Sequence, residues 1–375
     1  MKRSFKIARQ NHNGSKEFKT GRDFGALFQL ALCPQGFEKG RILKPNMTVF
    51  GATPDGEPVH QITLQNGALT AQILTFGATV RDLRMEGVDH PLVLGNETLE
   101  PYFEKLRYFG AIVGRFANRL SNGSFSIDGK DYTVEKNFRG RHMLHGGTAG
   151  VGSKVWAVKD VTDTSVTLSL ELSDGDMGFP GNMAVDVIYS LPGDGALQVD
   201  ISAQTDAASP CNFAHHGYFN LDGSDTITDH ILQIEAEHYL PVDDDLIPTG
   251  EARAVADTPF DFTVPRPIGT DGYDHNFCLS REKGPLRRVV TVRGAKSGIT
   301  LDVETNETGV QVYDGGQMPQ DGLPGLDGRV YRTNAGLALE AQVWPDAPNQ
   351  PDFPTAILYP GETYRQTTRY IFSKE

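Results

Sequence analysis

The sequence is poor in cysteine, with only three in 375 residues. Cys33, Cys211 and Cys278 are far apart, odd in number and without a Cys-x-x-Cys pair. This spacing argues against a disulfide framework, a zinc site or a redox motif. We interpret the three side chains as free thiols, which favours a reducing compartment.

Long apolar runs are also missing. No stretch approaches the roughly 18 consecutive apolar residues that a membrane-spanning helix needs. The apolar run at residues 24–33 is short, starts late and lacks a small-residue cleavage site, so it does not resemble a signal peptide. We therefore expect a cytoplasmic protein with no membrane partner.

Positive charge is scarce over most of the chain. The formal net charge is -13, and an acidic excess argues against a nucleic-acid partner and favours a neutral small molecule. Residues 1–46 differ, with ten Lys/Arg against three Asp/Glu, so they carry +7 and the remainder carries -20. We expect residues 1–46 to form a basic, poorly ordered N-terminal extension. It is either a solvated tail or a start upstream of Met47 as the usual first residue, and the alternative is a segment that binds an anionic partner.

Helical periodicity is limited to one short candidate turn at residues 99–105, whereas alternation of apolar and polar residues is common. Turn sequences such as Asn122-Gly123 and Asp128-Gly129 separate the alternating segments. The pattern predicts an all-β fold, a large antiparallel β-sandwich in which residues 47–375 form a single domain. The clearest predicted strands are residues 166–172, 197–203, 231–236 and 299–304.

Five segments place a charge or an imidazole among apolar residues: 114–119, 144–147, 214–221, 273–277 and 337–342. His216 carries the side chain that titrates near neutral pH, although a hydrogen-bonded core histidine is the simpler interpretation of its segment alone. Glu340 follows four apolar or small residues. Desolvation there favours the protonated form and makes the carboxylate a stronger base, the alternative being a structural ion-paired glutamate.

Taken together, these segments resemble the aldose 1-epimerase (galactose mutarotase) family from about Val49 to the C-terminus. Residues 239–243, 345–349 and 360–364 are further segments that are similar to sequences of this family. The resemblance implies the large β-sandwich of that family, a galactose mutarotase-like supersandwich, in a monomer or homodimer. It also implies an enzyme that interconverts the α and β anomers of free aldohexoses such as D-galactose and D-glucose.

The resemblance implies specific roles. Glu340 matches the general base that takes the proton from the C1 hydroxyl, and His216 matches the general acid that protonates the ring oxygen. We expect the two groups on opposite sides of the sugar ring. Each positioned acid or base contributes about 10²- to 10⁴-fold, so no cofactor or metal is expected. The positions that match sugar-holding residues are Asn118, Arg119, His145, Asp274 and Gln311.

Two neighbours of His216 depart from the family pattern. The family commonly has Asn where this chain has His215, and Ser where it has Gly217. Because adjacent side chains on a strand point to opposite faces, we expect His215 to pack away from His216. The aromatic residues Phe116, Tyr218 and Phe277 either cover the apolar face of the sugar or fill the core, and we favour the core.

Four other functions compete with this interpretation. One is a non-catalytic sugar-binding module of the same fold. Another is a glycoside hydrolase that uses Asp274 and Glu340, which requires a defined separation of the two carboxylates. A hexose 6-phosphate enzyme would need cations beyond Arg119 and Arg115, and Arg115 is equally suited to a structural role. The last is a metal site built from His142, His145, His215 and His216.

Overall fold

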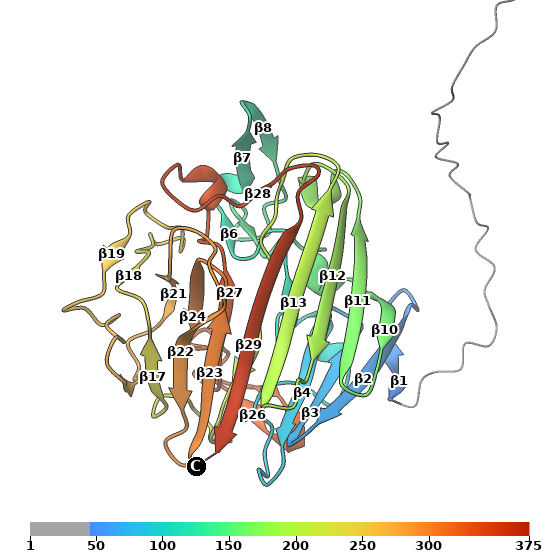
Figure 1. Cartoon of the computed structure of the whole chain (residues 1–375), viewed down its shortest axis with the longest axis vertical. Helices are drawn as coiled ribbons and strands as arrows, with labels where there is room; N and C mark the ends of the chain where they lie inside the picture. The colour runs from blue at the N-terminus through green and yellow to red at the C-terminus, as the bar shows by residue number, and fades with distance from the viewer. Residues whose placement is uncertain (1–45, 375) are drawn as a thin grey trace, which may run out of the picture. The chain divides into compact units, whose positions relative to one another are not determined.

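The computed structural model describes residues 46–374, so the extension predicted for residues 1–46 lies outside the described residues except for Asn46. The largest element is a nine-stranded antiparallel sheet whose long strands lie side by side in Figure 1. In spatial order its strands are β10 (Ala157–Val161), β11 (Ser165–Leu172), β12 (Met183–Ser190), β13 (Ala196–Thr205), β29 (Tyr364–Lys374), β23 (Ile299–Thr305), β22 (Arg287–Arg293), β17 (Ile231–Ile234) and β20 (Arg266–Pro267).

A six-stranded antiparallel sheet carries much of the candidate site. Its central strand β27 is buried along its whole length, because both faces of the strand are covered. Leu337 and Leu339 belong to the main core, whereas Glu340 belongs to the alternate face. In spatial order the strands are β16 (Tyr218–Phe219), β27 (Leu337–Gln342), β24 (Gly309–Tyr313), β21 (Asp274–Cys278), β18 (His238–Tyr239) and β19 (Arg253–Ala254).

A four-stranded sheet and five two-stranded pairs complete the described strands. The sheet contains β1 (Met47–Ala52), β2 (Pro58–Asn66), β3 (Leu69–Leu74) and β4 (Thr79–Met85). The pairs are β5 (Ile112–Val113) with β15 (Ala214–His215), β6 (Arg119–Leu120) with β9 (Met143–Leu144), β7 (Ser124–Ile127) with β8 (Lys130–Thr133), β14 (Ser209–Pro210) with β28 (Ile357–Leu358), and β25 (Leu323–Pro324) with β26 (Val330–Tyr331).

Helical structure within residues 46–374 is limited to six 3₁₀ segments. They are η1 (Glu100–Phe103), η2 (Ser121–Gly123), η3 (Val151–Ser153), η4 (Asp176–Gly178), η5 (Leu326–Gly328) and η6 (Ala347–Asn349). The first coincides with the helical turn predicted at residues 99–105. None of the helices in the described part of the chain is long and apolar enough to cross a membrane.

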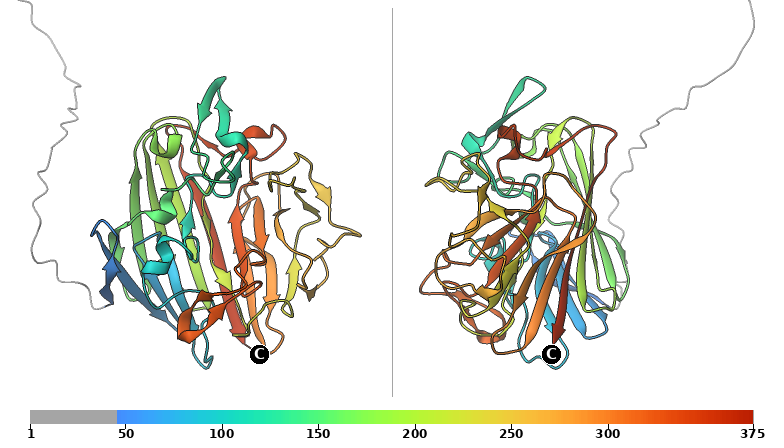
Figure 2. Two further views of the ribbon diagram at one scale, coloured as in Figure 1. Left: turned by 180° about the vertical axis from the view of Figure 1, so that it is seen from behind. Right: turned by 60° about the vertical axis from the view of Figure 1, so that its left-hand side comes forward.

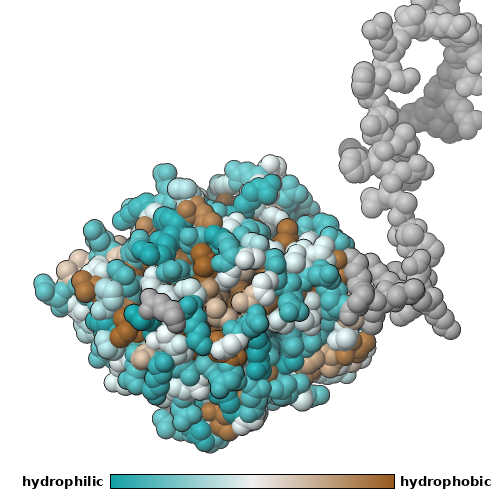
Figure 3. All heavy atoms as spheres, turned by 60° about the horizontal axis from the view of Figure 1, so that its bottom comes forward, coloured by the Kyte–Doolittle hydropathy of each residue, from teal (hydrophilic) through white to brown (hydrophobic). Residues whose placement is uncertain are grey.

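One hydrophobic core joins apolar side chains from the four-, six- and nine-stranded sheets, and the two views in Figure 2 show these sheets stacked in layers. Strand alternation decides which side chains enter the core. Along β23, for example, buried and half-buried side chains alternate strictly. The predicted antiparallel β-sandwich is therefore confirmed, as are the strands expected at residues 166–172, 197–203 and 299–304, whereas the strand expected at 231–236 ends at Ile234. On the face in Figure 3, hydrophilic side chains dominate and apolar ones form small scattered groups.

Candidate active site

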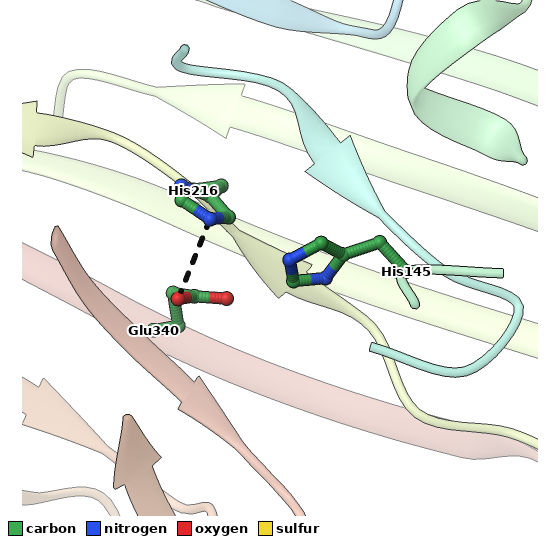
Figure 4. A group of neighbouring side chains, drawn as sticks. All are labelled: His145, His216 and Glu340. Carbon is green, nitrogen blue, oxygen red and sulfur yellow. Dashed lines mark ion pairs between the residues drawn. The ribbon is translucent and has the colours of Figure 1, made fainter. Parts of the chain in front are cut away.

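The site centres on His216 and Glu340, which point toward each other in Figure 4. His216 follows strand β15, and its backbone is fixed on both sides: its N–H donates to the Ala111 carbonyl and its carbonyl accepts from the Gly110 N–H, each at 2.9 Å. Glu340 lies in the middle of β27. The His216 Nε2 to Glu340 Oε1 distance is 3.5 Å, and both side chains are at least 95% buried.

Burial dominates the electrostatics of this pair. It raises the pKa of Glu340 well above its ordinary value, with Asp274 adding to the increase and Arg119 opposing it. Burial also lowers the pKa of His216 to about 4, and there Asp274 opposes the shift. The shifts make the Glu340 carboxylate a stronger base and the His216 imidazolium a stronger acid than either would be in water.

The separation of the pair corrects one expectation from the sequence. We expected the base and the acid on opposite sides of the sugar ring, but a pyranose does not fit between atoms 3.5 Å apart. The two groups lie side by side because β16, which continues from His216, pairs directly with β27. A ligand placed against both groups would therefore meet them with neighbouring atoms.

A chain of hydrogen bonds connects the polar side chains next to the pair. Arg119 donates from Nη2 to Asp274 Oδ2 at 3.0 Å and from Nη1 to Asn118 Oδ1 at 3.2 Å. Gln311 donates from Nε2 to Asp274 Oδ1 at 2.6 Å. Gln311 also pairs in register with Glu340 across β24 and β27. Four of the five predicted sugar-holding residues therefore form one network beside Glu340.

The fifth, His145, lies close to His216, with ring centroids 5.1 Å apart. The Asn118 N–H donates to His145 Nδ1 at 3.1 Å. Nδ1 is therefore an acceptor, and neutral His145 carries its proton on Nε2. Burial, with His216 and Arg119, lowers the pKa of His145 well below its ordinary value, so at neutral pH it presents a hydrogen-bond donor.

Asn118 and His145 both adopt the left-handed backbone region, with φ of 64° and 50°. Residues other than glycine rarely do so, and such strained positions concentrate at binding and active sites.

Several polar atoms of the site are buried without a hydrogen-bond partner, among them Glu340 Oε2, His216 Nδ1 and Gln311 Oε1. Buried polar atoms are almost always satisfied, so a cluster of unpartnered ones points to a polar ligand or to water. Sequence reasoning did not name Asn276 and Gln342, whose side-chain amide atoms are also buried without a partner within hydrogen-bond geometry, on strands that carry site residues. Strand alternation was the available signal, because they follow Asp274 and Glu340 by two residues and share their faces.

Aromatic rings pack beside the two histidines of the site. Tyr108, which the sequence did not single out, has its ring 4.7 Å from His145 and 5.9 Å from His216, and Tyr218 lies 5.1 Å from His216. Both line a cavity of about 490 Å³ together with Tyr313. A larger cavity of about 640 Å³ is formed by other residues, among them Ala236, Cys278 and Trp344, and neither cavity is lined by any of the polar residues described above.

The predicted core role of the aromatic residues is confirmed for Phe116 and Phe277, which are fully buried in hydrophobic clusters. Tyr218 packs against Phe109 in the core and also faces His216. Arg115 is structural: its guanidinium donates to backbone carbonyls of residues 173, 180 and 181.

The hypothesis of a four-histidine metal site is wrong, because the histidines do not come together. His142 pairs with Asp245, and His215 packs against two tyrosines. Among the described residues, donor atoms of His145, His216 and Glu340 do lie within 4.8 Å of one another. A metal needs a lone pair on the imidazole nitrogen that faces it, and His145 turns a protonated Nε2 toward the site. This donor set therefore fits a hydroxylated ligand better than a metal.

Comparison with known proteins agrees with this geometry. A sequence model of the family described as aldose 1-epimerase matches residues 60–371. The chain is 43% identical to galactose mutarotase from Homo sapiens over 341 residues, which are 87% of this chain and 97% of the relative. It is 35% identical to aldose 1-epimerase from Escherichia coli, with 86% and 97% covered.

Solved structures give the same result. An aldose epimerase homologue from C. elegans superposes with a TM-score of 0.79 at 35% identity, covering 84% of this chain and 98% of that one. Galactose 1-epimerase from Lactobacillus acidophilus superposes with a TM-score of 0.76 at 26% identity, covering 88% and 98%. This chain belongs to the aldose 1-epimerase family.

Proposed function

We propose that the protein is a mutarotase that interconverts the α and β anomers of free aldohexoses, with D-galactose and D-glucose as the first candidates. The observation that carries the proposal is the pair of Glu340 and His216, 3.5 Å apart and buried beside a network of hydrogen-bonding side chains. Family membership and the galactose mutarotase named among the relatives support the same activity.

The reaction begins with the C1 hydroxyl of the sugar against Glu340 and the ring oxygen against His216. The pair shares one proton, which the opposite pKa shifts place on Glu340 at rest, and its transfer to His216 Nε2 gives the reacting state. The Glu340 carboxylate then takes the C1 hydroxyl proton while the His216 imidazolium gives its proton to the ring oxygen. The bond between C1 and the ring oxygen breaks and C1 becomes an aldehyde. Rotation about the bond between C1 and C2 exposes the other face, and the reverse transfers close the ring as the other anomer. The pair holds one proton before and after the cycle.

The surrounding side chains hold the sugar in this proposal. Arg119, Gln311 and His145 Nε2 supply donors, and Asp274 supplies acceptor oxygens, which suits the hydroxyl groups of a pyranose. The tyrosines of the neighbouring cavity cover its apolar surface. Because Asp274 already accepts from Arg119 and Gln311, a positioning role fits it better than the second carboxylate of a glycoside hydrolase.

The test is polarimetry on freshly dissolved α-D-galactose and α-D-glucose. Wild type should accelerate the change in optical rotation with a bell-shaped pH profile. Glu340→Gln and His216→Asn should each lower kcat by about 10²- to 10⁴-fold with a modest change in KM. The exposed side chains Glu235 and His238 provide matched controls, and Glu235→Gln and His238→Asn should leave the rate unchanged.

Near-normal rates in either site variant would contradict the proposal. If wild type binds galactose in calorimetry but does not accelerate the rotation change, the protein is a non-catalytic sugar-binding module instead. We also propose that residues 47–375 act as one domain, and that the protein works in the cytoplasm, which the free thiols of Cys211 and Cys278 support.

A further inference from the structure

His215 and Gly217 flank His216, and neither has a part in the proposed reaction. His215 points away from His216 into the layer between the sheets, where it is 97% buried. Its ring lies 5.3 Å from Tyr370 and 6.2 Å from Tyr189, both at steep angles. Burial lowers the pKa of His215 to about 3, so the ring is neutral at physiological pH. Neither ring nitrogen has a partner within hydrogen-bond geometry, so we assign the ring a role in packing.

The ring of His215 occupies the space that a side chain at position 217 would need. A Cβ atom at position 217 would lie 2.5 Å from Cε1 of His215, and 3.2 Å and 3.3 Å from its two ring nitrogens. Contacts under 3.0 Å require a shift, and the ring is confined by Tyr189 and Tyr370. The φ of Gly217 lies outside the left-handed region, so the neighbouring ring, and not the backbone conformation, excludes a side chain here.

The His215 ring also lies between the backbone segment of His216 and the strand of Glu340. On one side, His215 is joined directly to His216. On the other, Tyr370 donates its hydroxyl hydrogen to the Leu339 carbonyl at 3.1 Å, and Leu339 precedes Glu340 in β27. A displaced His215 ring would therefore move the segment that holds the acid relative to the strand that holds the base.

We infer that His215 and Gly217 form one interdependent positioning unit that sets His216 against Glu340. His215 is a positioning residue, and its ring fills the space that the missing side chain at 217 leaves. The inference rests on the proposed mutarotase activity for its kinetic part only, because the packing of the pair is independent of the reaction.

The experiment is a double-mutant cycle with Gly217→Ala, His215→Asn and the double variant, measured by polarimetric kcat and KM and by Tm. Gly217→Ala alone should lower kcat at least about 10-fold with KM within about threefold, because the sugar-holding residues lie elsewhere. In the His215→Asn background, the shorter side chain leaves room for the methyl group. In that background, adding Gly217→Ala should change kcat by less than about threefold.

A second substitution guards against a Gly217→Ala protein that does not fold. His215→Phe keeps a ring without nitrogen atoms, so it should retain kcat within about threefold and leave the pH profile in place. A large loss of kcat in His215→Phe, or a shifted profile, would overturn the assignment of a packing role. Additive effects in the cycle, with Gly217→Ala equally harmful in the wild-type and His215→Asn backgrounds, would overturn the interdependence.

The two kinds of failure are distinguishable. Coupling in Tm without coupling in kcat would refute positioning while the packing match stands. If Glu340→Gln keeps a normal rate, the proposed function fails, and the Tm cycle still tests the packing.

Discussion

Asp274 offers the sharpest test of the network beside the catalytic pair. Its carboxylate accepts from Arg119 at 3.0 Å and from Gln311 at 2.6 Å, with side-chain exposures of 18% for Asp274 and 7% for Arg119. Asp274→Asn keeps the shape but removes the charge. Breaking one partner of a buried ion pair costs about 3 kcal/mol, and we expect a loss of that order in the free energy of unfolding.

The same change should alter catalysis in a defined direction. The negative charge of Asp274 raises the pKa of both Glu340 and His216, so its removal should lower both. The bell-shaped profile of kcat should therefore move to lower pH. Because Arg119 and Gln311 lose the acceptor that orients them, kcat/KM should fall at least about 10-fold, equivalent to one charge-assisted hydrogen bond.

The assays are urea unfolding followed by circular dichroism and polarimetry across pH. Asp327→Asn is the matched control. Asp327 makes a bidentate ion pair with Arg84, whose Nη1 and Nη2 donate to the two carboxylate oxygens at 3.0 Å each. The side chains of Arg84 and Asp327 are 33% and 41% exposed. Such a pair is worth less than about 1 kcal/mol, and the control should keep its activity. If Asp274→Asn matches this control in stability, pH optimum and rate, the reasoning about the network is refuted.

Two further predictions concern histidines. His145→Leu should lower kcat/KM by about 10- to 100-fold through the loss of a buried donor and leave the pH profile in place, because His145 transfers no proton; a shifted profile would make it a proton carrier. Unfolding stability should fall as pH decreases from about 6.5 towards 4. The folded-state pKa values of His145, His215, His216 and His230 lie below the unfolded value, so the unfolded chain binds the protons first. Each contributes up to about 1.4 kcal/mol per pH unit, and equal urea midpoints at pH 7 and pH 5 would contradict this.

The sequence by itself determined the fold class. Strand alternation is local, so segments such as residues 299–304 could be read without knowing their partners, and the scarcity of helical periodicity ruled out a parallel α/β fold. His216 and Glu340 could also be marked, because an imidazole or carboxylate among apolar neighbours stands out in its own segment, whereas Gln311 and the other sugar-holding residues were named only through the family resemblance. Asn276 and Gln342 were missed, although they lie two residues beyond named positions on the same alternation.

Only the tertiary structure decided how these segments meet. Residues 216 and 340 are more than a hundred positions apart, and the pairing of β16 with β27 brings them to 3.5 Å, side by side rather than across a ring. The proton position on His145 depended on the Asn118 N–H, and the need for Gly217 depended on the ring of His215. Distances, tautomers and excluded volume arise from contacts between distant segments, and a one-dimensional pattern of residue types does not contain them.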